Sequence, residues 1–92
     1  MKKMSREQIE IKKERIQQFI DRFNDKNEDI ASLRNQSLVF IEDLFGKKSK
    51  VYRQYMYVGF PPSDKGKYTE DDVKVFKSIL SEAMDILEDL SK

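Results

Sequence analysis

The stretch that decides the fold runs from Thr69 to Leu90 and reads TEDDVKVFKSILSEAMDILEDL. Its apolar residues recur at alternating spacings of three and four, which is the period of one helical face. They are Val73, Phe76, Leu80, Ala83, Leu87 and Leu90, with Ile79, Met84 and Ile86 widening the stripe. Thr69 followed by acidic residues is typical of a helix N-terminus. The sequence therefore predicts a helix over 70–90 whose wide stripe packs between two neighbours or crosses an oligomer interface.

Two earlier segments carry the same helical period. We expect the first helix over 5–23, because Ser5 and Gln8 have the spacing of a capping box. Its apolar stripe consists of Ile9, Ile16, Phe19, Ile20 and Phe23. Ile11 lies on the opposite side of this helix and is either an ordinary exposed residue or part of a second contact surface.

The second helix is expected over 28–45, with Asn27 as its N-cap. Its stripe consists of Ile30, Leu33, Phe40, Ile41 and Leu44. Gly46 is the expected stop, because glycine takes the left-handed cap conformation without cost. The polar residues 24–28 predict a tight connection between the first two helices. One long helix is the alternative, because Ile9, Ile16, Phe23 and Ile30 keep a seven-residue spacing.

The segment 50–57 is ambiguous between a short helix and an extended strand. Its valine and tyrosine residues have strand propensity, but Val51, Tyr55 and Val58 also have helical spacing, and Ser49 can cap a helix. A lone strand would have nothing to pair with in this chain, so we predict a helix that carries the chain across one end. Pro61 and Pro62 prevent its continuation.

These segments together predict an all-α fold over 1–92 as a single domain. The architecture is a small antiparallel helical bundle of three long amphipathic helices plus one short helix. Hydrophobic and charged residues each make up 38% of the 92 residues, which implies a thin core. We therefore expect part of the last helix, or the segment around 47–57, to be buried against a partner.

The residue inventory limits the chemistry. The chain contains no histidine and no cysteine, so it lacks the usual general base, thiolate nucleophile and zinc ligands. The carboxylates Glu82, Asp85 and Asp89 lie off the apolar stripe and are expected to be solvated. We predict no catalytic residues, no metal ligands and no cofactor, and hence a protein that is not an enzyme.

The candidate binding residues form a basic–aromatic segment. They are Lys47, Lys48, Lys50, Tyr52, Arg53, Tyr55 and Tyr57. This pattern predicts a protein-protein interaction module, whose partner is either another protein or a second copy of the chain. Binding of nucleic acid is the alternative, because such residues neutralise phosphates and stack on bases. The formal net charge of +1 argues against a dedicated nucleic-acid binder.

No segment approaches the length of about 20 apolar residues that spans a bilayer. The N-terminal residues Met1-Lys2-Lys3-Met4 are followed by a mostly charged stretch rather than by the apolar core of a signal peptide. We therefore expect a soluble, cytoplasmic protein with no membrane partner.

Overall fold

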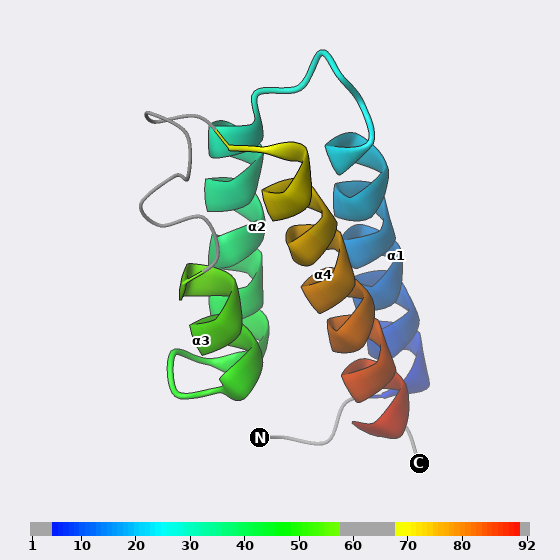
Figure 1. Cartoon of the computed structure of the whole chain (residues 1–92). Helices are drawn as coiled ribbons and strands as arrows, with labels where there is room; N and C mark the ends of the chain where they lie inside the picture. Colours follow the sequence, from blue (N-terminus) through cyan, green and yellow to red (C-terminus); the bar gives the residue numbers. More distant parts are fainter. Residues whose placement is uncertain (1–4, 58–67, 91–92) are drawn as a thin grey trace.

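The computed structural model describes residues 5–57 and 68–90, and this part of the chain is all-α. Its helices are α1 (Arg6–Phe23), α2 (Ile30–Phe45), α3 (Lys50–Tyr57) and α4 (Glu70–Leu90). Figure 1 shows that successive helices run in opposite directions, so chain neighbours are antiparallel. The predicted bundle of three long helices plus one short helix is confirmed.

The short helix is placed differently from the expectation. We expected it to cross one end of the bundle, but α3 lies alongside α2 and also packs against α4 (Figure 1). Because α1 packs against both α4 and α2, the helices form a closed ring of contacts. The short helix α3 therefore occupies the fourth position of the bundle over part of its length. It covers a face of α4 that three helices alone would leave open.

The capping box at the start of α1 is confirmed. The Ser5 hydroxyl accepts a hydrogen bond from the backbone N–H of Gln8 at 3.2 Å. In return, the Gln8 side-chain oxygen accepts from the backbone N–H of Ser5 at 3.1 Å. Both donors would otherwise be unsatisfied at a helix N-terminus.

The connection between α1 and α2 covers residues 24–29, and α2 starts two residues later than predicted. Asp29, and not Asn27, caps α2, because its carboxylate accepts from the backbone N–H groups of Ala31 and Ser32. The backbone N–H of Asn27 is instead held at 2.9 Å by the side chain of Asp25. These side-chain contacts stabilise a turn, so the alternative of one long helix is wrong.

The chain leaves α2 through a glycine conformation that differs in detail from the expected one. Gly46 has φ 88° and ψ 159°, which is a region that essentially only glycine adopts, but it is not the left-handed helical cap. Ser49 then accepts from the backbone N–H of Tyr52 at 3.1 Å and starts α3. The extended alternative for 50–57 is therefore wrong.

The core is centred on α4, which packs against both α1 and α3. The centroid of the Phe76 ring lies 5.5 Å from that of the Phe23 ring of α1 and 5.2 Å from that of the Tyr55 ring of α3. The buried residues of α4 are Phe76, Ile79, Leu80, Ala83 and Leu87, and the half-buried Val73, Met84, Ile86 and Leu90 pack against the core. α1 and α3 cover the predicted stripe, which agrees with the first of the two expectations, that this helix packs between two neighbours.

Across residues 5–57 and 68–90, none of the helices combines the length and the apolar character that crossing a membrane requires.

Candidate functional site

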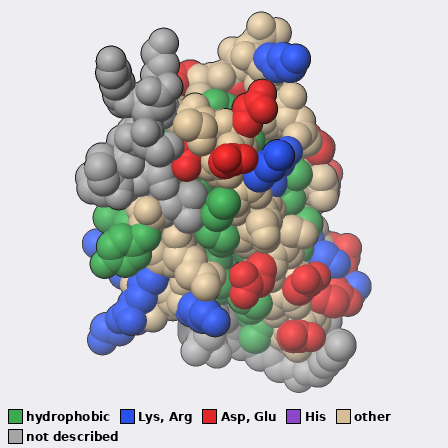
Figure 2. Space-filling model, in the orientation of Figure 1, with side chains coloured by type: hydrophobic (Ala, Val, Ile, Leu, Met, Phe, Trp, Pro, Cys, Tyr) green, Lys and Arg blue, Asp and Glu red, His purple; other side chains and the backbone are tan. Residues whose placement is uncertain are grey.

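The structure brings most of the basic–aromatic segment to one corner of the bundle, made by α3 and the turn before it. Lys47, Lys48, Lys50 and Arg53 are exposed, Tyr52 is half-buried and Tyr57 is 79% exposed. In Figure 2, basic side chains gather at the lower left of the view, over this part of the molecule. The corner therefore presents both positive charge and aromatic surface.

Tyr55 is a correction to the predicted set. Its side chain is 0% exposed and lies in the core, so it is not available to a partner. On a helix, residues four apart share a face, and Val51 and Tyr55 together form the buried face of α3. The Tyr55 hydroxyl is hydrogen-bonded to the buried Ser37 hydroxyl of α2. Burial raises the pKa of the Tyr55 phenol above its ordinary value of 10.0.

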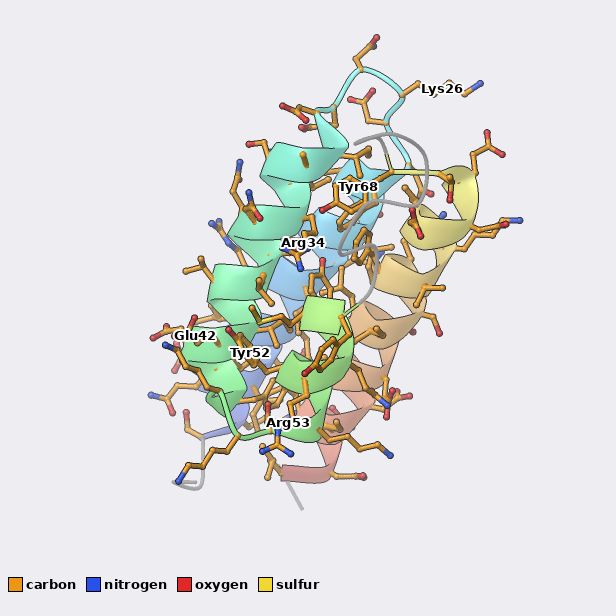
Figure 3. All side chains as sticks on the ribbon, turned by 60° about the vertical axis from the view of Figure 1, so that its left-hand side comes forward. Lys26, Arg34, Glu42, Tyr52, Arg53 and Tyr68 are labelled. Atoms are coloured by element: carbon orange, nitrogen blue, oxygen red, sulfur yellow. The ribbon has the colours of Figure 1, made fainter. Side chains whose placement is uncertain are left out.

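The exposed face of α3 is hollowed. A depression of about 300 Å³ is lined by Tyr52, Arg53, Met56 and Tyr57. In Figure 3, Tyr52 and Arg53 lie in the lower part of the molecule, where α3 is drawn. Met56 was not predicted, although its spacing of three from Arg53 and four from Tyr52 is the signal that places it on this face. We call these four residues the α3 corner.

The positive charges of this region are largely uncompensated. Lys47 lies 3.6 Å from the Glu42 carboxylate, which is a long contact between exposed groups. Lys48, Lys50 and Arg53 form no ion pair within the described parts of the chain. By contrast, Arg6 and Lys13 of α1 each lie 2.8 Å from Glu88 of α4. The basic side chains on the α1–α4 side are thus paired within the bundle. Those on and beside α3 remain available to bind an acidic partner.

A buried arginine of α2 fixes the end of α3. The Arg34 guanidinium donates to the backbone carbonyl of Met56 at 2.8 Å, and its residue is only 6% exposed. Ser37 is also buried and donates to a carbonyl of its own helix. Sequence reasoning missed both residues. The available signal was their helical spacing with Ile30 and Ile41, which puts two polar residues on an apolar stripe.

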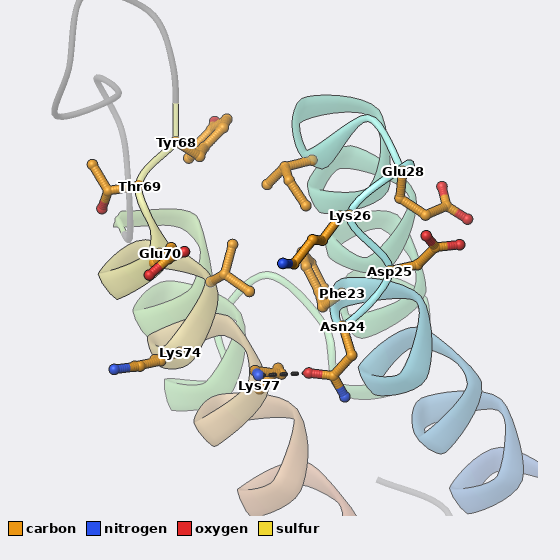
Figure 4. A pocket seen from close by; sticks show the side chains of 12 residues that line it. Phe23, Asn24, Asp25, Lys26, Glu28, Tyr68, Thr69, Glu70, Lys74 and Lys77 are labelled. Atoms are coloured by element: carbon orange, nitrogen blue, oxygen red, sulfur yellow. Dashed lines mark hydrogen bonds between the residues drawn. The ribbon is translucent and has the colours of Figure 1, made fainter.

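A second hollow, of about 370 Å³, lies between the α1–α2 connection and the start of α4 (Figure 4). Lys77 donates to the Asn24 side chain across it at 2.7 Å, as the dashed line in Figure 4 shows. The Glu28 carboxylate at its rim pairs with Arg22 at 2.9 Å. Its lining combines three lysines with three acids, so the charge is balanced. The contacts of this hollow serve to hold the connection in place.

Among the acidic residues near the C-terminus of α4, the Glu88 carboxylate pairs with cations of α1. Two cations surround Glu88, and hydrogen bonds from Lys13 and Arg6 lower the pKa of its carboxyl to about 2. Glu82, Asp85 and Asp89 are exposed, as predicted. In the described residues, no three acidic side chains come together in an arrangement that could hold a metal ion.

No protein-family model matches the chain, and comparisons with curated proteins and with solved structures gave no significant match.

Proposed function

We propose that this chain is a small, non-enzymatic helical module that binds an acidic segment of a partner protein through the α3 corner. The observation that carries the proposal is the composition of that hollow. Tyrosine, arginine and methionine are enriched at the centres of protein interfaces, and here all four lining residues belong to these types. Tyr57, at 79% exposure, has little role in the core.

The charge around the hollow supports an acidic partner. Lys47, Lys48 and Lys50 precede the hollow along the chain, and Arg53 lies within it. Charges at the rim of an interface mainly steer the encounter and select the partner, while the central aromatic and arginine side chains supply most of the affinity. A segment that combines carboxylates with apolar side chains would complement both parts of this surface.

The corner is also held in place before any partner binds. An isolated helix of eight residues is unstable in water, so α3 depends on its tertiary contacts. Val51 and Tyr55 anchor its buried face, and Arg34 holds its last turn. A preorganised surface loses less conformational entropy on binding. The fold thus supports the proposal by fixing the exposed face of α3.

Nucleic-acid binding is less well supported than protein binding. Of the three tyrosines predicted for stacking, Tyr55 is inside the core, and Tyr52 is half-buried. Only Tyr57 presents most of its ring to solvent. The net charge of +1 adds little general attraction for phosphates. We therefore treat nucleic acid as a competing outcome of the experiment.

The experiment titrates isotope-labelled protein with a short synthetic peptide that alternates Asp or Glu with Leu or Phe, followed by NMR chemical shifts. We expect the shifted amides to cluster on α3 and the preceding turn. Arg53→Glu and Tyr57→Ala should each weaken binding by about ten-fold or more. Lys26→Glu, which makes the same charge change at the opposite end of the bundle, is the matched control and should bind normally.

A parallel titration uses single-stranded DNA and RNA oligonucleotides at several salt concentrations. Tight binding that falls steeply with salt and exceeds the peptide affinity would replace our proposal with the nucleic-acid reading. If Arg53→Glu and Tyr57→Ala leave the peptide affinity unchanged, the α3 corner is not the binding site and the proposal is wrong.

A further inference from the structure

A second exposed apolar surface lies between α1 and α2, away from the α3 corner. Two adjoining hollows of about 360 Å³ and about 490 Å³ are lined only by residues of these two helices and share Arg15 and Phe40. The Phe19 and Phe40 rings form the floor, with centroids 5.7 Å apart. The Arg15 guanidinium lies 5.6 Å from the centre of the Phe19 ring. We call this surface the α1–α2 groove.

The groove is bordered by two large apolar side chains that the core does not use. Ile11 on α1 is 61% exposed, and Val39 on α2 is 63% exposed. A single exposed apolar residue is normal on a protein surface. These two, however, line adjoining hollows that share the half-buried Phe40 ring, so they form one continuous apolar surface. Such contiguous surfaces mark contact sites, which favours the second of the two readings of Ile11.

The two edges of the groove carry opposite charge. The α1 edge contributes Lys12 and Arg15 against the single acid Glu14, whereas the α2 edge contributes Asp43. None of these four side chains forms an ion pair within residues 5–57 and 68–90. A surface with one basic edge and one acidic edge is complementary to a copy of itself that is turned by half a revolution.

The levels of these residues along the helices agree with such an arrangement. At about 1.5 Å per residue, Arg15 lies about 12 Å from the end of α1, and Val39 lies about 14 Å from the start of α2, at the same end of the bundle. By the same reckoning, Lys12 lies about 17 Å and Asp43 about 20 Å from that end. A two-fold axis parallel to the helices would therefore place Lys12 of one copy beside Asp43 of the other.

We propose that a second copy of this chain covers the α1–α2 groove, in a symmetric dimer in which α1 of each copy lies antiparallel on α2 of its partner. Val39 then packs against the Ile11 side chain and the Arg15 stem of the partner. In the other arrangement, α1 of one copy would lie on α1 of its partner. Lys12 and Arg15 would then face the same two basic residues of the partner. The charge pattern therefore selects the α1-on-α2 arrangement.

The size of the surface sets the strength of the dimer. Helices α1 and α2, about 27 Å and about 24 Å long and packed about 9 Å apart, present a face of roughly 500 Å² per copy. The total of roughly 1,000 Å² is at the low end for a specific interface, so we expect a weak dimer. The dimer should thus form and dissociate readily with concentration.

Sedimentation velocity over a concentration series from about 1 µM to about 500 µM, at low salt, tests this proposal. The wild-type chain should change from monomer to dimer within the series. Val39→Glu and Ile11→Glu should each raise the dissociation constant by about ten-fold or more. Val75→Glu is the matched control, since Val75 is an exposed valine on α4 outside the groove, and it should dimerise as the wild type does.

A charge exchange tests the relative orientation of the copies. Lys12→Glu and Asp43→Lys should each weaken the dimer, and the double variant should recover most of the wild-type affinity because the pairing is restored with its signs reversed. Circular dichroism of every variant checks that the helices are intact. A strict monomer throughout the series, or a dimer indifferent to Val39→Glu, overturns the proposal. Failure of the double variant to recover overturns the α1-on-α2 arrangement.

Discussion

Replacing Ser37 by alanine should destabilise the fold more than replacing Tyr55 by phenylalanine, although both changes remove the same hydrogen bond. The Ser37 hydroxyl lies 2.9 Å from the Leu33 carbonyl and 3.0 Å from the Arg34 carbonyl. Both carbonyls can only accept, so the single hydroxyl proton of Ser37 is donated to its own helix. The Tyr55 phenol must then donate to the Ser37 oxygen. The hydrogen bonds therefore run in one direction, from Tyr55 to Ser37 and from Ser37 to the carbonyls of α2. This direction is the reason why the two substitutions should differ in their cost to stability.

The expected magnitudes follow from what each substitution leaves behind. Ser37→Ala leaves the Tyr55 phenol at 0% exposure with no acceptor among the described residues, which should cost about 1–3 kcal/mol. Tyr55→Phe leaves Ser37 bonded to its carbonyls and keeps the ring contact with Phe76, so its cost should be about 0.5–1.5 kcal/mol. The double variant has no buried hydroxyl without an acceptor at this position. Its loss in unfolding free energy should therefore be about 1–2 kcal/mol smaller than the sum of the losses of the two single variants.

Urea unfolding followed by circular dichroism measures these free energies, provided that the transition is two-state with an unchanged slope in all variants. Tyr57→Phe, which removes a hydroxyl from an exposed tyrosine, is the control and should leave the midpoint unchanged. Strictly additive costs, or a Tyr55→Phe variant that is less stable than Ser37→Ala, would refute this direction of the hydrogen bonds.

Four further predictions concern Glu88, Gly46, Arg34 and Tyr55. The pKa of Glu88 is lowered from 4.5 to about 2, so its contribution to stability is complete above pH 4.5 and is lost as the pH falls toward 2; Glu88→Gln should lower the melting temperature at neutral pH but not at the acid limit. Gly46→Ala should cost about 1–3 kcal/mol by urea unfolding, since the new Cβ meets nothing within 4 Å and only the φ of 88° opposes it. Arg34→Met should cost about 1–3 kcal/mol and speed amide exchange in the last turn of α3. Because burial raises the pKa of Tyr55, this phenol should ionise only when alkali unfolds the chain, and phenolate absorbance should show one tyrosine titrating late.

The long helices were predictable because their apolar residues recur with the helical period and most of their caps are local in sequence. Ser5 with Gln8, and Thr69 with Asp72, lie within one turn of the residues that they cap. The start of α2 was predicted two residues too early. Asn27 and Asp29 are both good N-caps by residue type, and in the structure Asp29 caps α2 while the backbone N–H of Asn27 bonds the Asp25 side chain.

The sequence predicted which segment forms the candidate site, but not which of its side chains are buried and which are exposed. Grouping by residue type placed Tyr55 with Tyr52 and Tyr57, whereas its spacing of four from Val51 puts it on the buried face of α3. The role of Arg34 could not be predicted, because its partner is the carbonyl of Met56, 22 residues away. Tertiary contacts of this kind depend on where α3 lies, and the predicted position of 50–57 across one end of the bundle was wrong.

The position of α3 also determines where the surplus apolar surface lies. If the short helix crossed one end of the bundle, the wide stripe of α4 would be open to a partner. Because α3 covers that stripe, the remaining exposed apolar side chains fall mainly on the α3 corner and on the α1–α2 groove. These surfaces share no residue, so a dimer formed through the groove leaves both corners free. Each dimer would then present two binding corners, and a partner with repeated acidic segments would gain affinity through effective concentration without any new contact.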